Sequence, residues 1–239
     1  MRGEGIAERL SPFNRYAREY DEWFTGEGRR LFATELRAFR QVLPRLPKPW
    51  LEIGVGSGRF AQALGIETGV DPSLRLLRMA RTRGVSAFLA RGEERLFEEG
   101  SFGTVFLIVT LCFLDCPMDV LQEARRVLMP HGKIVLGLVL SDSPWGEFYR
   151  QRAEEGHRFY RHATFYSYDE LVVLLQTAGL RVERVISTLL QNPGAVERVE
   201  EPHEGYLPNA GFTVVLAAKP GKRTHSEAQS EAPQDGLPP

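Results

Sequence analysis

Short apolar runs and helix-period segments alternate along the middle of the chain. The apolar runs are the size of single strands and predict buried β-structure. They lie at 50–53, 67–71, 85–90, 102–111 and 133–140. Segments with apolar residues every three or four positions predict helices between and before these runs. They lie at 27–43, 59–64, 72–84 and 118–132. Strands that alternate with helices indicate a parallel, doubly wound sheet with helices on both faces.

The pattern changes after residue 140. Residues 141–166 are rich in aromatic side chains and His but have no clean period. Ser167 and Glu170 then fit a capping box at the start of a helix. Two strand-like runs follow, 180–193 and 211–220, joined by a polar loop. We therefore expect an α/β fold, a Rossmann-like doubly wound sheet that is mostly parallel with an antiparallel edge strand.

Composition narrows the class of partner. The chain has 239 residues, of which 43% are hydrophobic, and a formal net charge of -1. A chain so close to neutral has no long-range field that would attract nucleic acid or an anionic membrane, so a nucleic-acid partner is disfavoured. The N-terminal residues have no apolar leader, and no run reaches the roughly 20 residues of a membrane span. We expect a cytoplasmic protein, monomeric or homodimeric, with no membrane association.

Cys112 and Cys116 are the two cysteines. They are four positions apart in an apolar segment, without a nearby His or Cys that could complete a metal site. We expect neither a metal nor a disulfide, and we expect both cysteines in the core.

The stretch "WLEIGVGSGRF" carries the strongest chemical signal. Gly54, Gly56 and Gly58 follow an apolar strand and precede a helix, where a missing Cβ lets a ligand approach the backbone. Asp71 ends the next apolar run, where its carboxylate can accept hydrogen bonds from ribose hydroxyls. A dinucleotide fingerprint would need its third glycine at Arg59, so a nicotinamide-dependent oxidoreductase is the less favoured interpretation. A structural turn without any ligand is a further alternative.

Four motifs, in order along the chain, resemble those of the class I S-adenosylmethionine-dependent methyltransferases. They are "LEIGVGSG", "GVDPS", "SFGTVFLIVTLCFLDCP" and "EARRVLMPHGKIVLGL". "YAREYDEWF" near the N-terminus is similar to a segment of the small-molecule type, including the ubiquinone and menaquinone biosynthesis methyltransferases. Three positions depart from the family pattern: Gly103 replaces an Asp, His131 replaces a Gly, and the stretch after Gly92 lacks a proline.

The resemblance implies S-adenosylmethionine as the cofactor and a set of residues that hold it. The glycine turn would lie against the methionyl part with Glu52, Asp71 would bind the ribose, and Tyr16 and Tyr20 would close over the site. The full set is Tyr16, Tyr20, Glu52, Gly54, Gly56, Gly58, Asp71, Pro72, Ser73, Gly92, Glu93, Glu94, Thr110 and Leu111. The domain limits follow: a helical cap at 1–45, a methyltransferase domain at 46–219 with a substrate-side insertion at 141–168, and a disordered tail at 220–239.

The acceptor should bind the aromatic insertion, because an apolar lining with a few polar groups is typical of a small-molecule pocket. The candidates are Trp145, Tyr149, His157, Tyr160 and Phe165. His157 is the candidate base, since imidazole titrates near neutral pH. Each ring taken alone is better explained by simple packing on the sheet. The predicted function is methyl transfer to a small molecule. A protein that binds the cofactor without catalysis, as a sensor or assembly partner, is the alternative.

Overall fold

The computed structural model describes residues 12–220, and the predicted tail and the first residues of the predicted cap lie outside that range. One eight-stranded sheet organises the fold, with strand order β3-β2-β1-β4-β5-β8-β6-β7. The strands are β1 Trp50–Ile53, β2 Thr68–Asp71, β3 Ser86–Leu89, β4 Phe102–Ile108, β5 Leu128–Leu138, β6 Arg181–Thr188, β7 His203–Glu204 and β8 Phe212–Ala218. The α-helices are α2 Ala17–Trp23, α3 Arg29–Arg40, α4 Arg59–Leu64, α5 Leu74–Thr82, α6 Pro117–Val127, α7 Pro144–Glu154 and α8 Tyr168–Thr177. Short 3-10 turns, η1 Leu43–Arg45, η2 Leu111–Phe113 and η3 Tyr160–His162, complete the list.

The predicted mixed sheet is confirmed. The first five strands in the order pair in parallel, as the strand–helix alternation indicated. β8 pairs antiparallel with both β5 and β6, and β7 pairs antiparallel with β6 at the edge. Antiparallel pairing therefore extends from the edge strand β7 inward to β5, with β8 between β5 and β6.

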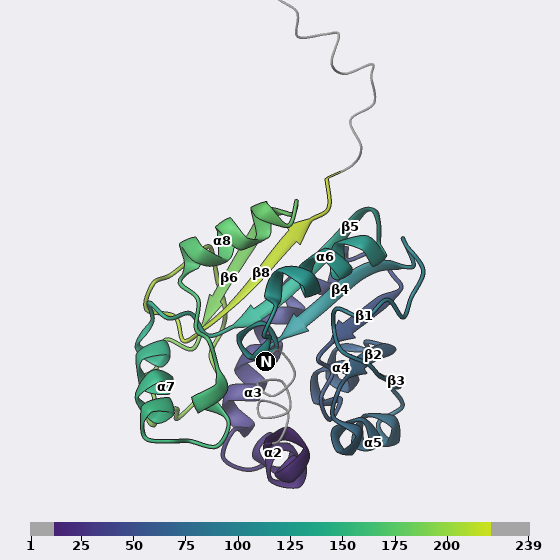
Figure 1. The fold of residues 1–239 in the computed structure, drawn as a ribbon. Coiled ribbons are helices and arrows are strands. Elements are labelled where there is room, and N and C mark those ends of the chain that lie inside the picture. Colours follow the sequence, from purple (N-terminus) through teal and green to yellow (C-terminus); the bar gives the residue numbers. More distant parts are fainter. Residues whose placement is uncertain (1–11, 221–239) are drawn as a thin grey trace, which may run out of the picture.

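Two hydrophobic layers hold helices on the two faces of the sheet. Alternate residues of β4 point to opposite faces, so Phe106 packs in one layer and Leu107 in the other. α3, α4 and α5 pack on the Phe106 face, whereas α6 and α8 pack on the Leu107 face. Figure 1 shows α6 (teal) and α8 (green) over the same face of the sheet, with α2 (purple) beyond the ends of β1 and β4.

Most predicted elements are present, and three details differ. The helix expected over 118–132 ends at Val127, because β5 begins at Leu128 and takes up Pro130 and Gly132 as strand residues. The run expected as a strand to residue 111 ends at Ile108, and Val109 adopts a left-handed backbone with φ of 50°. α7 lies inside the segment without clean periodicity; Pro144 occupies its first turn and the Ser143 side chain accepts from the Gly146 N–H.

One of the two cysteines departs from the expectation that both lie in the core. Cys112 is buried, but Cys116 is exposed at the residue before α6. Its four-residue offset from Cys112 crosses the end of η2, so the two thiols lie in different environments. Among the described helices, none is long and apolar enough to cross a membrane.

Candidate functional site

The three glycines of the turn differ in what surrounds them. All three have positive φ: 79° at Gly54, 52° at Gly56 and 79° at Gly58. A Cβ on Gly54 would lie 2.3 Å from the Thr110 hydroxyl oxygen, and one on Gly58 would lie 2.9 Å from the Ala80 backbone. A Cβ on Gly56 would meet nothing closer than the Tyr20 ring at 3.8 Å. Gly56 thus faces open space, while its neighbours allow close packing within the protein.

Asp71 joins the ends of β1 and β2. Its Oδ2 accepts from the Gly56 N–H at 2.9 Å, and its Oδ1 accepts from the Ser73 N–H at 2.8 Å. Burial raises the pKa of this carboxyl to about 6, although both hydrogen bonds act to lower it. Each oxygen retains lone-pair capacity, and Asp71 lines the cavity beside the turn.

A first cavity, which we call the turn cavity, lies over the glycine turn at the carboxyl ends of β1, β2 and β4. Eight of the predicted cofactor residues line it: Tyr20, Gly54, Gly56, Asp71, Pro72, Gly92, Glu93 and Thr110. They come from five separate stretches of the sequence that the sheet topology brings to one edge. This is the position at which open α/β sheets bind ligands.

Six other predicted residues do not line the turn cavity. Gly58 packs on α5, as described above, and Leu111 is buried in the hydrophobic layer under α6. The Glu94 carboxylate accepts from the Arg91 N–H at 3.1 Å, which shapes the loop rather than the cavity. The Glu52 Oε2 is buried without a hydrogen-bond partner among the described residues, and burial together with Asp71 raises the Glu52 pKa.

The remaining two, Ser73 and Tyr16, contact the N-terminal segment. The Ser73 hydroxyl lies 2.9 Å from Asn14 Oδ1 and caps α5 by accepting from the Leu76 N–H. The Arg158 guanidinium lies 4.7 Å from the centre of the Tyr16 ring. Both therefore hold neighbouring segments together instead of facing the turn cavity.

The turn cavity is also lined by residues that no sequence motif indicated. Phe13, Arg91, Val109, Phe113 and Asp115 are among them. The left-handed backbone at Val109, a β-branched residue, has no sequence signal, and Arg91 differs in no visible way from the many other arginines. Phe13 and Phe113 have no signal of their own in the sequence beyond the general abundance of aromatic residues.

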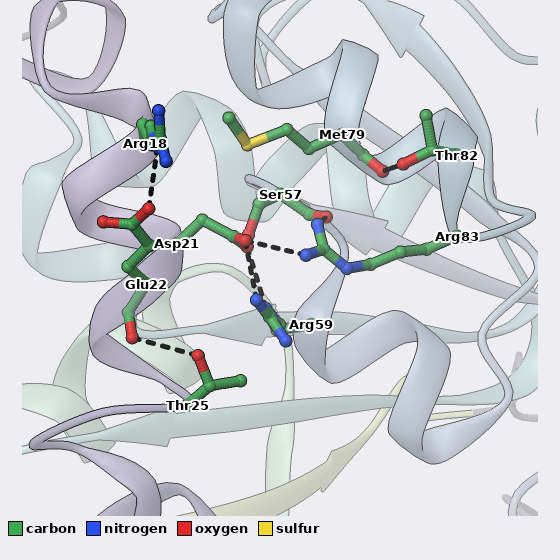
Figure 2. A network of polar contacts seen from close by, with 9 residues as sticks. All are labelled: Arg18, Asp21, Glu22, Thr25, Ser57, Arg59, Met79, Thr82 and Arg83. Atoms are coloured by element: carbon green, nitrogen blue, oxygen red, sulfur yellow. Dashed lines mark hydrogen bonds and ion pairs between the residues drawn. The ribbon is translucent and has the colours of Figure 1, made fainter.

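An ion-pair cluster fixes α2 over the turn (Figure 2). Arg59 contacts both Asp21 oxygens, at 2.8 and 2.7 Å, and Arg83 donates to Asp21 Oδ2 at 2.7 Å. Arg83 also donates to the Ser57 carbonyl of the glycine turn at 2.6 Å. Burial alone would raise the pKa of Asp21, but the hydrogen bonds from Arg59, Ser57 and Arg83 outweigh it and lower the pKa.

A second cavity of about 550 Å³, which we call the aromatic cavity, adjoins the first. All five predicted acceptor residues, Trp145, Tyr149, His157, Tyr160 and Phe165, line it. Four residues line both cavities and form a shared wall: Phe13, Tyr20, Val109 and Phe113. The two cavities therefore share part of their lining.

His157, the candidate base, lines the aromatic cavity and packs against a tyrosine ring. Its ring stacks on Tyr160 with centroids 4.3 Å apart, and its Nδ1 accepts from the Phe159 N–H at 3.4 Å. Burial and the nearby Arg152 and Arg158 lower its pKa, which favours the neutral ring.

Glu35 is a lining residue that the sequence analysis did not single out. It lies on α3 and is only 7% exposed. Burial raises the pKa of its carboxyl to about 8. The one available signal was a charged residue on the apolar stripe of a helix, which is common enough to be overlooked.

Comparisons with known proteins agree on the family. Residues 51–136 match the family model described as "Methyltransferase domain". An uncharacterized protein of Mycobacterium tuberculosis is 41% identical over 209 residues, which cover 87% of this chain and 73% of the relative. An uncharacterized protein of Methanocaldococcus jannaschii is 33% identical and is covered in full. A solved structure from Thermotoga maritima, described as an S-adenosylmethionine-dependent methyltransferase and possible histamine N-methyltransferase, is 35% identical. It superposes with a TM-score of 0.82, over 88% of this chain and 99% of that one.

Proposed function

Because the chain belongs to the class I S-adenosylmethionine-dependent methyltransferases, we propose that it transfers a methyl group to a small-molecule acceptor bound in the aromatic cavity. The observation that carries this proposal is the shared wall of Phe13, Tyr20, Val109 and Phe113. It puts an apolar, ring-lined space directly beside the cavity over the glycine turn. Such a space is suited to an organic molecule of modest size.

S-adenosylmethionine is the cofactor of this protein, and the turn cavity has the chemistry to hold it. Gly56 leaves open space at the turn, so a ligand can contact the backbone there. Asp71 lines the same space and can accept hydrogen bonds from two hydroxyl groups. We therefore assign the ribose to Asp71 and the methionyl part to the turn, with Pro72, Gly92 and Glu93 beside the adenine.

The protein contributes by orienting the acceptor and by excluding water from the site. The bound cofactor supplies an electrophilic methyl carbon, which needs no covalent activation by the protein. Tyr20 and Phe113 form part of the wall between the two cavities, where they fix the orientation of an acceptor and exclude water. Burial raises the pKa of Tyr20, so its hydroxyl stays protonated and does not act as a base at neutral pH.

The size of the aromatic cavity supports a small acceptor. Trp145 and Tyr149 are anchored in it: the Trp145 indole N–H donates to the Gln191 carbonyl at 2.8 Å, and the two rings lie 5.8 Å apart. The Thermotoga maritima protein, described as a possible histamine N-methyltransferase, is likewise named for a small acceptor. Cofactor binding without catalysis is the competing function, and only turnover separates the two.

The test is a methyl-transfer assay with labelled S-adenosylmethionine and a panel of small oxygen, nitrogen and sulfur nucleophiles, read as formation of S-adenosylhomocysteine. Tyr160→Ala should lower kcat/KM for any accepted molecule but leave S-adenosylhomocysteine affinity unchanged, because Tyr160 lines the aromatic cavity only. Val173→Ala, at an exposed position of α8, is the control and should match the wild type. Cofactor binding without turnover of any panel member would instead favour the non-catalytic function.

A further inference from the structure

The Glu35 carboxyl is a buried acid without a partner. It makes no hydrogen bond or ion pair with another described residue, and its side chain lines the aromatic cavity. Its charge acts on Tyr149 and Tyr160, whose pKa values it helps to raise. A buried ionisable group in this situation destabilises the ligand-free protein, because water can no longer solvate its charge.

The other charged residues of the aromatic cavity differ from Glu35 in that they are exposed. Glu19 pairs with Arg158 at 2.8 Å, and Glu27 lies at an exposed position before α3. The Arg152 guanidinium is exposed too, 5.5 Å from the centre of the Phe148 ring. Of the described lining residues, Glu35 is therefore the one charged side chain that is buried.

Aromatic rings line the same cavity as this buried acid. Trp145, Tyr149, Tyr160 and Phe165 line the same cavity, and the Tyr149 and Tyr160 rings lie 4.4 Å apart. The faces of aromatic rings attract cations, and a desolvated carboxylate attracts them more strongly. A cavity that combines the two favours a positively charged organic group over a neutral or anionic one.

We infer that Glu35 is the anionic binding residue for a cationic nitrogen of the methyl acceptor, so that the acceptor class is small organic amines. This inference rests on the proposed function, since it identifies the occupant of the same cavity. A neutral acceptor that takes a hydrogen bond from the protonated Glu35 carboxyl is the alternative. The two make opposite predictions about protons: an ammonium group pairs with the ionised carboxylate, whereas a neutral group pairs with the protonated one.

The experiment is calorimetric titration of the full chain, saturated with S-adenosylhomocysteine, with 2-phenylethylamine and with its neutral counterpart 2-phenylethanol. Burial gives Glu35 a pKa of about 8, so at pH 7 the amine should displace about one proton per molecule bound, measured in buffers of different ionisation enthalpy. The amine should bind about tenfold more tightly than the alcohol. In Glu35→Gln both the preference and the proton release should disappear.

Two variants make the result specific. Glu27→Gln removes an exposed carboxylate from the same cavity and should retain the proton release. Glu35→Asp keeps the charge on a shorter side chain and should restore part of the preference, which a merely structural role of Glu35 would not produce. Each variant should still bind S-adenosylhomocysteine, which shows that it is folded.

The inference is overturned if the alcohol binds as tightly as the amine, if the preference survives in Glu35→Gln, or if the wild type binds no amine at millimolar concentration. The proposed function has a separate point of failure. It fails if the wild type binds no S-adenosylhomocysteine or turns over no acceptor. Methylation of neutral acceptors alone would support the proposed function but contradict the inference that the acceptors are amines.

Discussion

Arg59 of α4 donates two hydrogen bonds to the carboxylate of Asp21 on α2, from Nε to Oδ1 at 2.8 Å and from Nη2 to Oδ2 at 2.7 Å. A two-point pair fixes orientation as well as distance. Asp21 follows Tyr20, which is part of the wall between the two cavities. The pair therefore determines where an aromatic wall of the site lies, although neither of its members lines a cavity.

Asp21→Asn should loosen this connection. The substitution leaves Arg59 and Arg83 without their carboxylate, and all three side chains are mostly buried. We expect the free energy of unfolding to fall by about 1–3 kcal/mol and the affinity for S-adenosylhomocysteine to fall with it. Chemical denaturation and calorimetric titration measure the two effects.

The control for this prediction is Glu22→Gln on the same helix, which breaks an exposed pair with Arg18. It should change stability by less than about 0.5 kcal/mol. The effect of Asp21→Asn should also shrink in acid: because the folded pKa of Asp21 is lowered, its stabilisation is present at neutral pH and lost as the pH falls through that folded pKa. Equal destabilisation by both variants would contradict the role given to Asp21.

The cofactor affinity should depend on the ionisation of Asp71. Its pKa of about 6 exceeds the ordinary 3.8, so this carboxyl lowers the stability of the cofactor-free protein as the pH rises from about 4 to about 6. The ionised form accepts hydroxyl hydrogen bonds best, so S-adenosylhomocysteine should bind about tenfold more weakly at pH 5 than at pH 7. Titration calorimetry at several pH values gives the curve.

The titratable groups near Asp71 and the variant Asp71→Ala serve as checks on this experiment. The raised pKa of Tyr20 keeps its hydroxyl protonated across this range, so it should not add a step, and burial together with Asp71 raises the pKa of Glu52 as well. Asp71→Ala should flatten the pH dependence and cost about 1–3 kcal/mol of binding at pH 7, or roughly tenfold to a hundredfold. A pH profile that persists in Asp71→Ala would assign it to another group.

Gly54→Ala should destabilise the protein more than Gly65→Ala does. The two glycines have nearly the same φ, 79° and 78°, so the backbone cost of alanine is the same at both. A Cβ on Gly54 meets the Thr110 side chain at 2.3 Å, whereas one on Gly65 meets nothing within 4 Å. The difference in unfolding free energy should be about 1–3 kcal/mol. Equal losses would show that the turn adjusts to the clash.

The two thiols should react at different rates. Cys116 is exposed and lines the turn cavity, while Cys112 is buried. An aromatic disulfide reagent should modify Cys116 in the native state, with Cys112 reacting only after unfolding, and S-adenosylhomocysteine should slow the first reaction. The assignment is checked with Cys116→Ser, in which the fast phase should be missing. A fast phase that bound S-adenosylhomocysteine does not slow would separate Cys116 from the cofactor.

Local sequence patterns predicted most of the elements and the family. The capping box of Ser167 and Glu170 is present as expected, because it depends only on residues three positions apart. The positions of β8 inside the sheet and of Glu35 inside the aromatic cavity had no such local signal. Both result from how distant segments pack, and a polar residue on a helix stripe looks the same whether water or a cavity faces it.

The same distinction, between local sequence signals and the packing of distant segments, applies to the residues of the site. Gly54 and Gly56 are identified by spacing alone, yet only the three-dimensional arrangement distinguishes the glycine that contacts Thr110 from the one that faces open space. Cys116 was expected in the core because its neighbours in the sequence are apolar, but the structure places it at the surface. The monomeric or dimeric state and the cytoplasmic location stay predictions.

The place of β8 has a consequence for how the protein is made. Phe212–Ala218 is the last strand of the described chain, yet it fills the gap between β5 and β6 and supplies Val214 to one hydrophobic layer and Val215 to the other. During translation, β6 can pair with the short strand β7 but cannot join β5 and the rest of the sheet until β8, about two dozen residues further along, has been synthesised, and both layers stay open until then. A ribosome that stalls before Phe212 therefore holds a nascent chain whose two hydrophobic layers are both incomplete, and such exposed apolar surface promotes aggregation.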